Sequence, residues 1–307
     1  MNDQSPKKVI VFIPALNEEE TIGSLIDKLR ELYDKKRTIP AGYEIEILLV
    51  NDGSTDKTEE IAISKGVAVR NHPANLGLGA ATRTGMETAY EMGADIAIKL
   101  DADFQHDPAD IEKVIMPIIR DNADICWGSR FAGKINYKMP LVRYLGNRFF
   151  TYLMNKLTYY KISDAQTGMM AFNRKYLAIF DIHGDYNPPQ QLLVDASFKH
   201  MRYFEVPVVF HPRTTGQSFV NLKYPFYVFT NIFRLLIFGN PLKVFSLLGI
   251  FSILFSFFYF FLAHLANIYA WSISGLFMQN VSLVTMIIGF QLLIFGILAD
   301  LIVKKRK

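Results

Sequence analysis

The C-terminal part of the chain contains a long stretch, residues 244–299, without a single Asp, Glu, Lys or Arg. Within it, Val244–Ala263 and Val281–Ala299 are almost entirely Leu, Ile, Phe and Val, and each has roughly the 20 residues with which a helix crosses the hydrocarbon core. Two buried helices of a soluble protein are the alternative, but such helices are rarely apolar around their whole circumference. We therefore expect a transmembrane hairpin in residues 243–307, with spans over about 244–264 and 280–302.

Basic residues flank this hairpin on both sides. Arg234 and Lys243 precede the first span, and Lys304–Lys307 follow the second, which predicts that both ends lie in the cytosol. The N-terminal apolar run Val9–Ile13 is too short for a signal peptide and meets Pro14 at once. We therefore expect the preceding domain to be cytosolic as well, in an integral membrane protein with two spans.

The segment that leads into the hairpin, residues 223–242, mixes Tyr, Phe, Ile and Leu with few polar side chains. This composition predicts an amphipathic helix that lies in the membrane interface. Elsewhere the net charge of +4 is modest and its positive residues are not clustered as in a nucleic-acid-binding protein. A single cysteine, Cys126, excludes an intrachain disulfide and a thiolate metal site.

Residues 1–222 alternate between short apolar runs and segments with helical spacing. We expect strands at Val9–Ile13, Ile45–Val50, Val67–Arg70, Ile96–Leu100 and Ile125–Gly128, and helices at Glu18–Leu32, Thr55–Lys65, Gly79–Met92 and Pro108–Arg120, the last with Asp107 as N-cap. This alternation predicts an α/β fold with a mostly parallel sheet. In such sheets, ligands bind beyond the carboxyl ends of the strands.

An acidic cluster follows the strand expected at Ile96–Leu100. In an extended backbone, Asp101, Asp103 and Gln105 point to the same side. Crowded carboxylate and amide oxygens suit Mg²⁺ or Mn²⁺, with substrate phosphates filling the remaining positions. The same alternation points His106 away, which favours a supporting role over metal ligation.

The glycine-rich run 75–79 precedes an expected helix and could bring backbone N–H groups near a phosphate. It lacks the Lys-Ser/Thr pair of a P-loop and the spacing of a dinucleotide fingerprint. This argues against an NTPase and against a dehydrogenase.

These loops, in their order and spacing, resemble the family 2 glycosyltransferases of the GT-A fold over about the first 130 residues. The matching patterns are Pro14-x-x-Asn17-Glu18, Asn51-Asp52-Gly53-Ser54-x-Asp56, Asn75-x-Gly77-x-Gly79 and Asp101-x-Asp103-x-Gln105. The resemblance implies a GT-A nucleotide-sugar-binding domain and a metal-dependent hexosyltransferase.

Later motifs resemble the dolichol-phosphate mannose synthase and polyprenyl-phosphate glucosyltransferase branch: Gly128-Ser129-Arg130, Pro140-x-x-Arg143, Asp164-x-Gln166-Thr167-Gly168 and Arg213-x-x-Gly216-x-Ser218. The branch implies inverting transfer of a hexose from a nucleotide sugar to dolichyl or undecaprenyl phosphate at the cytosolic face. The hairpin resembles that of the glucosyltransferases, which favours UDP over GDP in the donor. Thr167 and Phe219 depart from the Ser and Lys that are usual in the branch.

The resemblance also implies roles for single residues. The nucleotide would be held by Pro14, Leu16, Glu18, Val50, Asp52, Gly79, Asp101 and Ala102. Mg²⁺ or Mn²⁺ would be held by Asp103, Gln105 and Asp101. The acceptor phosphate would be held by Arg130, Arg143, Arg213 and Ser218. Asp103, Arg130 and Asp164 would be catalytic, with Asp164 either a base or a structural cap.

Other classes share part of this pattern. A processive polysaccharide synthase usually needs a Gln-x-x-Arg-Trp element, and neither Trp127 nor Trp271 follows an arginine. A transferase for another lipid, such as diacylglycerol, and a non-catalytic membrane-tethered sugar-nucleotide binder remain alternatives. A metal-dependent nucleotidyltransferase would need a lysine-rich phosphate loop, which is not visible. The pattern leaves the oligomeric state open, a homo-oligomer included.

Overall fold

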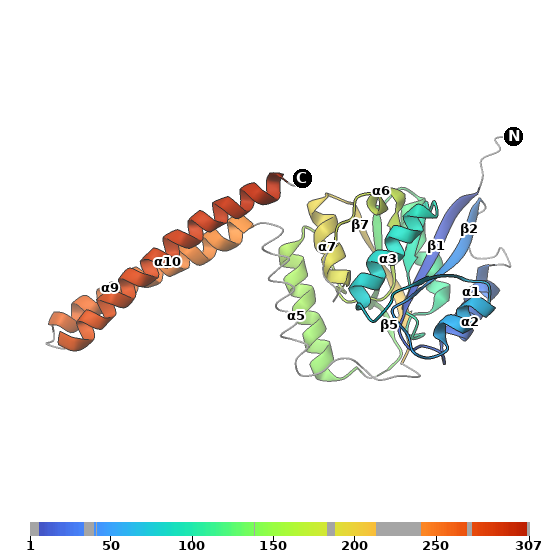
Figure 1. The fold of residues 1–307 in the computed structure, drawn as a ribbon, viewed down its shortest axis with the longest axis horizontal. Coiled ribbons are helices and arrows are strands. Elements are labelled where there is room, and N and C mark those ends of the chain that lie inside the picture. The colour runs from blue at the N-terminus through green and yellow to red at the C-terminus, as the bar shows by residue number, and fades with distance from the viewer. Residues whose placement is uncertain are drawn as a thin grey trace. The chain divides into compact units, whose positions relative to one another are not determined.

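The computed structural model describes residues 6–33, 40, 42–137, 139–182, 188–212, 241–268 and 272–305. The chain forms two compact units, Met1–Asn231 and Ile232–Lys307. The expected site residues Arg213 and Ser218, and nearly all of the expected interfacial helix 223–242, lie outside the described residues. The first unit carries the sheet, and the second carries two long helices (Figure 1).

The first unit is built on a seven-stranded sheet with the order β3-β2-β1-β4-β6-β5-β7. The strands are β1 (Lys7–Ala15), β2 (Tyr43–Asn51), β3 (Ala68–Asn71), β4 (Ile96–Lys99), β5 (Ile125–Ile135), β6 (Met170–Asn173) and β7 (Tyr203–Phe210). Only β6 runs antiparallel to its neighbours within this described sheet. The expected α/β fold with a mostly parallel sheet is confirmed.

Helices flank this sheet (Figure 1). They are α1 (Ile22–Tyr33), α2 (Thr58–Ser64), α3 (Leu78–Glu91), the 3₁₀ helix η1 (Pro108–Asp110), α4 (Ile111–Ile119), α5 (Leu141–Leu157), α6 (Arg174–Leu177) and α7 (Pro188–Phe198). The Asp107 side chain accepts a hydrogen bond from the Ala109 N–H at 3.0 Å, as expected of an N-cap. The helix expected from residue 108 therefore begins with one 3₁₀ turn before it becomes regular.

The hydrophobic core lies between the sheet and its helices. Every residue of β1 from Val9 to Ala15 is buried, as expected for a central strand covered on both faces. A Cβ atom at Gly85 of α3 would overlap the Phe12 ring, so the missing side chain lets α3 approach β1 closely. The core thus holds the carboxyl ends of β1, β2 and β4 rigidly at one edge of the sheet.

The second unit contains α9 (Pro241–Ile268) and α10 (Ser272–Lys305), which pack along each other in antiparallel directions. Their segments Pro241–Leu265 and Phe277–Ile302 are long and apolar enough to cross a membrane. Most of their side chains are not covered by protein; Leu247, for example, is 72% exposed. An apolar surface of this kind is stable in lipid but not in water, so these helices are candidate membrane spans that could form the expected hairpin.

Candidate active site

The loops that follow β1 and β2 are joined by hydrogen bonds. The Asn17 N–H donates to Ser54 Oγ at 3.0 Å, and Asn17 Oδ1 accepts from the Thr55 N–H at 2.8 Å. Asn17 has a φ of 54°, a left-handed conformation that Asn adopts more readily than most residues. The two sequence motifs therefore form one structure at the carboxyl edge of the sheet.

Asp52 organises the next loop. Its carboxylate lies 2.7 Å from His72 Nδ1 and accepts hydrogen bonds from the N–H groups of Leu76 and Gly77, each at 2.9 Å. The other His72 nitrogen lies 2.9 Å from Thr84 Oγ1 in α3. Asp52 is thus held by three partners, and its contact with a nucleobase stays a prediction.

The other residues expected to bind the nucleotide come from the same edge. Pro14 and Val50 are buried and lie opposite each other in the register of β1 and β2. Leu16 and Glu18 are half-buried in the loop after β1, and Gly79 is buried in the first turn of α3. The fold brings these residues to the ends of adjacent strands, where a ligand of a parallel sheet binds.

The acidic cluster after β4 adopts a turn, so the expected extended conformation is wrong. Phe104 has a φ of 57°, and Asp103 Oδ1 accepts a hydrogen bond from the Gln105 N–H at 3.1 Å. Contacts with the end of β7 hold this turn, since the His211 N–H donates to the Gln105 carbonyl at 2.7 Å. Simple alternation therefore does not determine where Asp101, Asp103 and Gln105 point.

The donor set of this turn suits a hard divalent cation. No group of three or more His, Cys, Asp or Glu side chains preformed for a metal occurs in the described part of the chain. Mg²⁺ and Mn²⁺ need no such cage when they bind a nucleotide diphosphate, because one or two carboxylates and the phosphates complete the shell. Asp103 is half-buried in the turn, so the oxygen donors present here fit the predicted metal, whose ligands stay a prediction.

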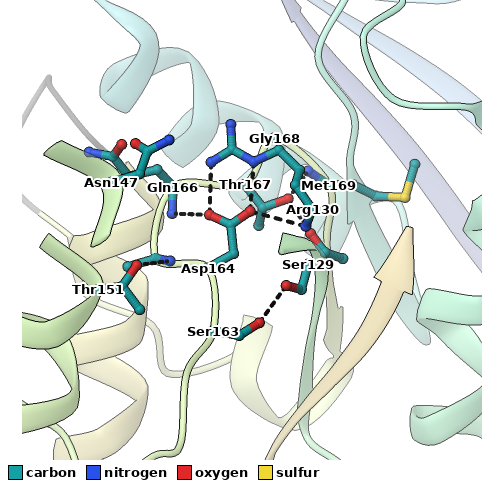
Figure 2. Close-up of polar contacts among 12 residues, drawn as sticks. Ser129, Arg130, Asn147, Thr151, Ser163, Asp164, Gln166, Thr167, Gly168 and Met169 are labelled. Carbon is teal, nitrogen blue, oxygen red and sulfur yellow. Dashed lines mark hydrogen bonds and ion pairs between the residues drawn. The ribbon is translucent and has the colours of Figure 1, made fainter. Parts of the chain in front are cut away.

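Arg130 and Asp164 form a buried ion pair (Figure 2). Arg130 Nε lies 2.6 Å from Asp164 Oδ2, and Nη2 lies 2.7 Å from Oδ1. Burial disfavours both charges, but their attraction outweighs it, so the pKa of Asp164 is lowered and that of Arg130 is raised. Asp164 Oδ1 also accepts from the Gln166 N–H at 3.0 Å, which is the geometry of a cap on this turn.

Two side chains near this pair were not assigned a ligand-binding role from the sequence. Lys99, at the end of β4, is 1% exposed and its ammonium pairs with the Asp101 carboxylate. His106 Nε2 accepts a hydrogen bond from the Gly168 N–H at 3.1 Å. Burial of the His106 ring lowers its pKa to about 4, so the imidazole is neutral near pH 7. In the sequence, only the presence of a lysine in an otherwise apolar strand could have indicated that Lys99 has a buried partner.

Arg143 lies half-buried in α5, on a helix that contains three basic residues and no acidic one. It has no described contact with Arg130 or Asp164. Its contact with an acceptor phosphate stays a prediction, as do those of Arg213 and Ser218.

Comparison with known proteins identifies the class. Residues 10–180 match the model of glycosyl transferase family 2. The UDP-N-acetylglucosamine–dolichyl-phosphate N-acetylglucosaminyltransferase of Methanococcus voltae is 33% identical over 225 residues, 66% of this chain and 85% of that protein. The dolichol-phosphate mannosyltransferase of Pyrococcus furiosus is 28% identical over 80% of this chain and 70% of its own length.

A solved structure shares the fold. Glucosyl-3-phosphoglycerate synthase from Mycobacterium tuberculosis, crystallised with Mn²⁺, UDP and glucosyl-3-phosphoglycerate, aligns with a TM-score of 0.56 and 21% identity over 75% of this chain and 79% of that one. The chain belongs to glycosyl transferase family 2 and is a glycosyltransferase with the GT-A fold.

Proposed function

We propose that this glycosyltransferase moves a hexose from a nucleotide sugar, UDP-linked by preference, to a polyisoprenyl phosphate at the cytosolic membrane face, with inversion at the anomeric carbon. The observation that carries the proposal is a strand-edge site with an acidic turn and a buried arginine, in a chain that also has two helices apolar enough to span a membrane. The named activities of the two relatives, which act on dolichyl phosphate, support the acceptor.

The donor would lie across the carboxyl ends of β1, β2 and β4. Asp103, with Asp101 or Gln105, would hold Mg²⁺ or Mn²⁺, which supplies charge stabilisation to the departing diphosphate. The loop fixed by Asp52 would hold the nucleoside. The Mn²⁺ and UDP present with the structural neighbour support this arrangement.

The acceptor is a phosphate oxygen that is already anionic near neutral pH, so the site has little need of a strong general base. Arg130 has a planar guanidinium suited to phosphate, and Asp164 orients it through two hydrogen bonds. Asp164 is fully buried with both oxygens engaged. Of the two roles left open for Asp164, this geometry favours positioning Arg130 over accepting a proton.

The test is a transfer assay with the full chain in detergent, a labelled UDP-hexose or GDP-hexose, Mn²⁺ and a polyprenyl phosphate. We expect transfer to the lipid, and a loss of at least about 100-fold in Asp103→Asn because a transition-state charge partner is removed. Asp121→Asn is the control, since this carboxylate is 88% exposed and lies before β5, at the opposite edge of the sheet.

Two results would contradict the proposal. Transfer to soluble glycans alone would refute the lipid acceptor. Wild-type turnover in Asp103→Asn would refute the metal assignment.

A further inference from the structure

Lys99 places an ammonium group inside the sheet. It lies in β4 between Phe12 of β1 and Met170 of β6, and only 1% of it is exposed. A buried ammonium is strongly unfavourable unless it is paired. Its Nζ donates to the Asp101 carboxylate and, at 3.4 Å, to the Gly168 carbonyl. The buried Lys99 ammonium is therefore compensated by these two acceptors.

Gly168 is held from both sides by the segment that carries the acidic turn. Its carbonyl faces Lys99, and its N–H donates to His106 Nε2 at 3.1 Å. A Cβ atom at Gly168 would overlap the Asp101 carboxylate, so this approach requires glycine. The acidic turn and the loop that contains Gly168 are thus packed as one body.

The same loop begins at Asp164, which holds Arg130 in the buried ion pair shown in Figure 2. Lys99 therefore contacts both the acidic turn, through Asp101, and the loop that holds Arg130, through Gly168. A shift of the Lys99 ammonium would move Asp101 and Gly168 together. The contacts of Lys99 therefore connect the part of the site expected to bind the donor with the part expected to bind the acceptor.

The ion pair also limits what Asp101 can do. A carboxylate in contact with an ammonium has much of its charge compensated, and a divalent cation would have to displace that ammonium to bind the same oxygen. Mg²⁺ and Mn²⁺ bound to a nucleotide need only one or two carboxylates. Asp103 in the same turn can supply one.

We propose that Lys99 is a positioning residue: it keeps Asp101 as its ion-pair partner and outside the metal's coordination shell, leaving Asp103 as the metal carboxylate, and it fixes the loop that orients Arg130. This inference rests on the proposed metal-dependent transfer and specifies how its two halves are aligned.

The test removes the ion pair as a neutral unit. Lys99→Met/Asp101→Asn leaves neither a lone ammonium nor a lone carboxylate. Replacing both members of a buried ion pair destabilises a protein much less than removing one of them. Mn²⁺ binding in the presence of UDP is measured by electron paramagnetic resonance on the full chain, together with the thermal unfolding temperature, the KM for the donor and kcat. Asp103→Asn is the reference for the loss of a metal ligand.

We expect the double variant to bind Mn²⁺ within about threefold of the wild type, while kcat falls about 10- to 100-fold, as for other residues that orient a metal site. Loss of Mn²⁺ binding equal to that of Asp103→Asn would overturn the inference by making Asp101 a ligand. Unchanged kcat would overturn it by removing the positioning role.

Two controls keep the outcomes separate. If the double variant does not fold, Lys99→Met alone replaces it, because the Asp101 side chain is 32% exposed and water can solvate its carboxylate; unchanged kcat again overturns the inference. A wild-type protein that binds no Mn²⁺ with either UDP or GDP would instead refute the metal-dependent donor binding of the proposed function.

Discussion

Asp124 joins three parts of the catalytic unit through one buried carboxylate. It accepts hydrogen bonds from the Arg202 N–H at 2.8 Å, from Arg202 Nε at 3.1 Å and from Asn173 Nδ2 at 2.9 Å. Burial by itself would raise the pKa of Asp124, but these hydrogen bonds outweigh it and lower the pKa to about 2. The charged carboxylate therefore stabilises the junction of β5, β6 and β7.

We predict that Asp124→Asn lowers the free energy of unfolding by about 2 kcal/mol at pH 7. Because the pKa of Asp124 is lower in the folded state, its contribution is complete above about pH 4 and is lost as the pH falls toward 2. Denaturant unfolding followed by tryptophan emission, with Trp271→Phe as the background in both proteins so that Trp127 alone reports, measures the difference. A difference in the free energy of unfolding between variant and wild type that stays constant from pH 7 to pH 3 would contradict this prediction.

At the scale of single elements, α5 exposes an unusual surface. Leu141, Leu145, Phe149 and Tyr152 are 56–69% exposed and recur at intervals of three or four residues, which places them on one side of the helix. Its basic side chains and its lack of acidic ones suit anionic lipid headgroups. We therefore expect α5 to contact the membrane from which the proposed acceptor is taken.

The double variant Leu145→Gln/Phe149→Gln tests this expectation. We predict that it lowers transfer to a long-chain polyprenyl phosphate in anionic liposomes by about tenfold. A tenfold loss corresponds to roughly 1.4 kcal/mol of membrane-binding free energy, which is less than the burial of two large apolar side chains provides. Transfer to a short, water-soluble acceptor should not change.

Ile63→Gln on α2 is the matched control, because Ile63 is an exposed apolar side chain, at 57%, on another helix. If both acceptors lose activity equally in the α5 variant, the effect is on folding and the prediction is wrong.

At the scale of the whole molecule, the hairpin is tied together by small residues. A Cβ atom at Gly289 would overlap Ile253, and Ser256 Oγ donates to the Ser282 carbonyl at 2.7 Å. Close backbone approach and hydroxyl hydrogen bonds of this kind stabilise helix pairs in lipid, where burial of apolar surface gives no advantage. The two helices are therefore expected to cross the membrane as one unit.

Cysteine labelling tests their orientation. Cys126 is fully buried, and burial raises the pKa of its thiol, so it should not react with a membrane-impermeant maleimide. We predict that Ile268→Cys, at the end of α9, is labelled in intact cells, whereas Lys305→Cys, at the end of α10, is labelled only after permeabilisation. The reverse pattern would place the catalytic unit outside.

Local patterns in the sequence were enough to predict most of the strands and helices of this protein. The apolar stretches predict the two long helices, and alternating apolar runs predict β1 to β5, because each depends on neighbours within a few residues. The ends of elements differ: the first helix begins at Ile22 rather than Glu18, because the N–H groups of Asn17 and Glu18 donate to the side chains of Ser54 and Thr58, which hold this segment in a loop.

The tertiary structure decided what the sequence motifs contact. The antiparallel β6, the pairing of Arg130 with Asp164 and the turn at Asp103, which is held by His211 just after β7, all depend on residues 34 or more positions apart. Lys99 shows the reason most clearly. A charged residue in an apolar strand is costly by itself, and only the arrival of Asp101 and Gly168 in the folded chain supplies the partners that make it stable.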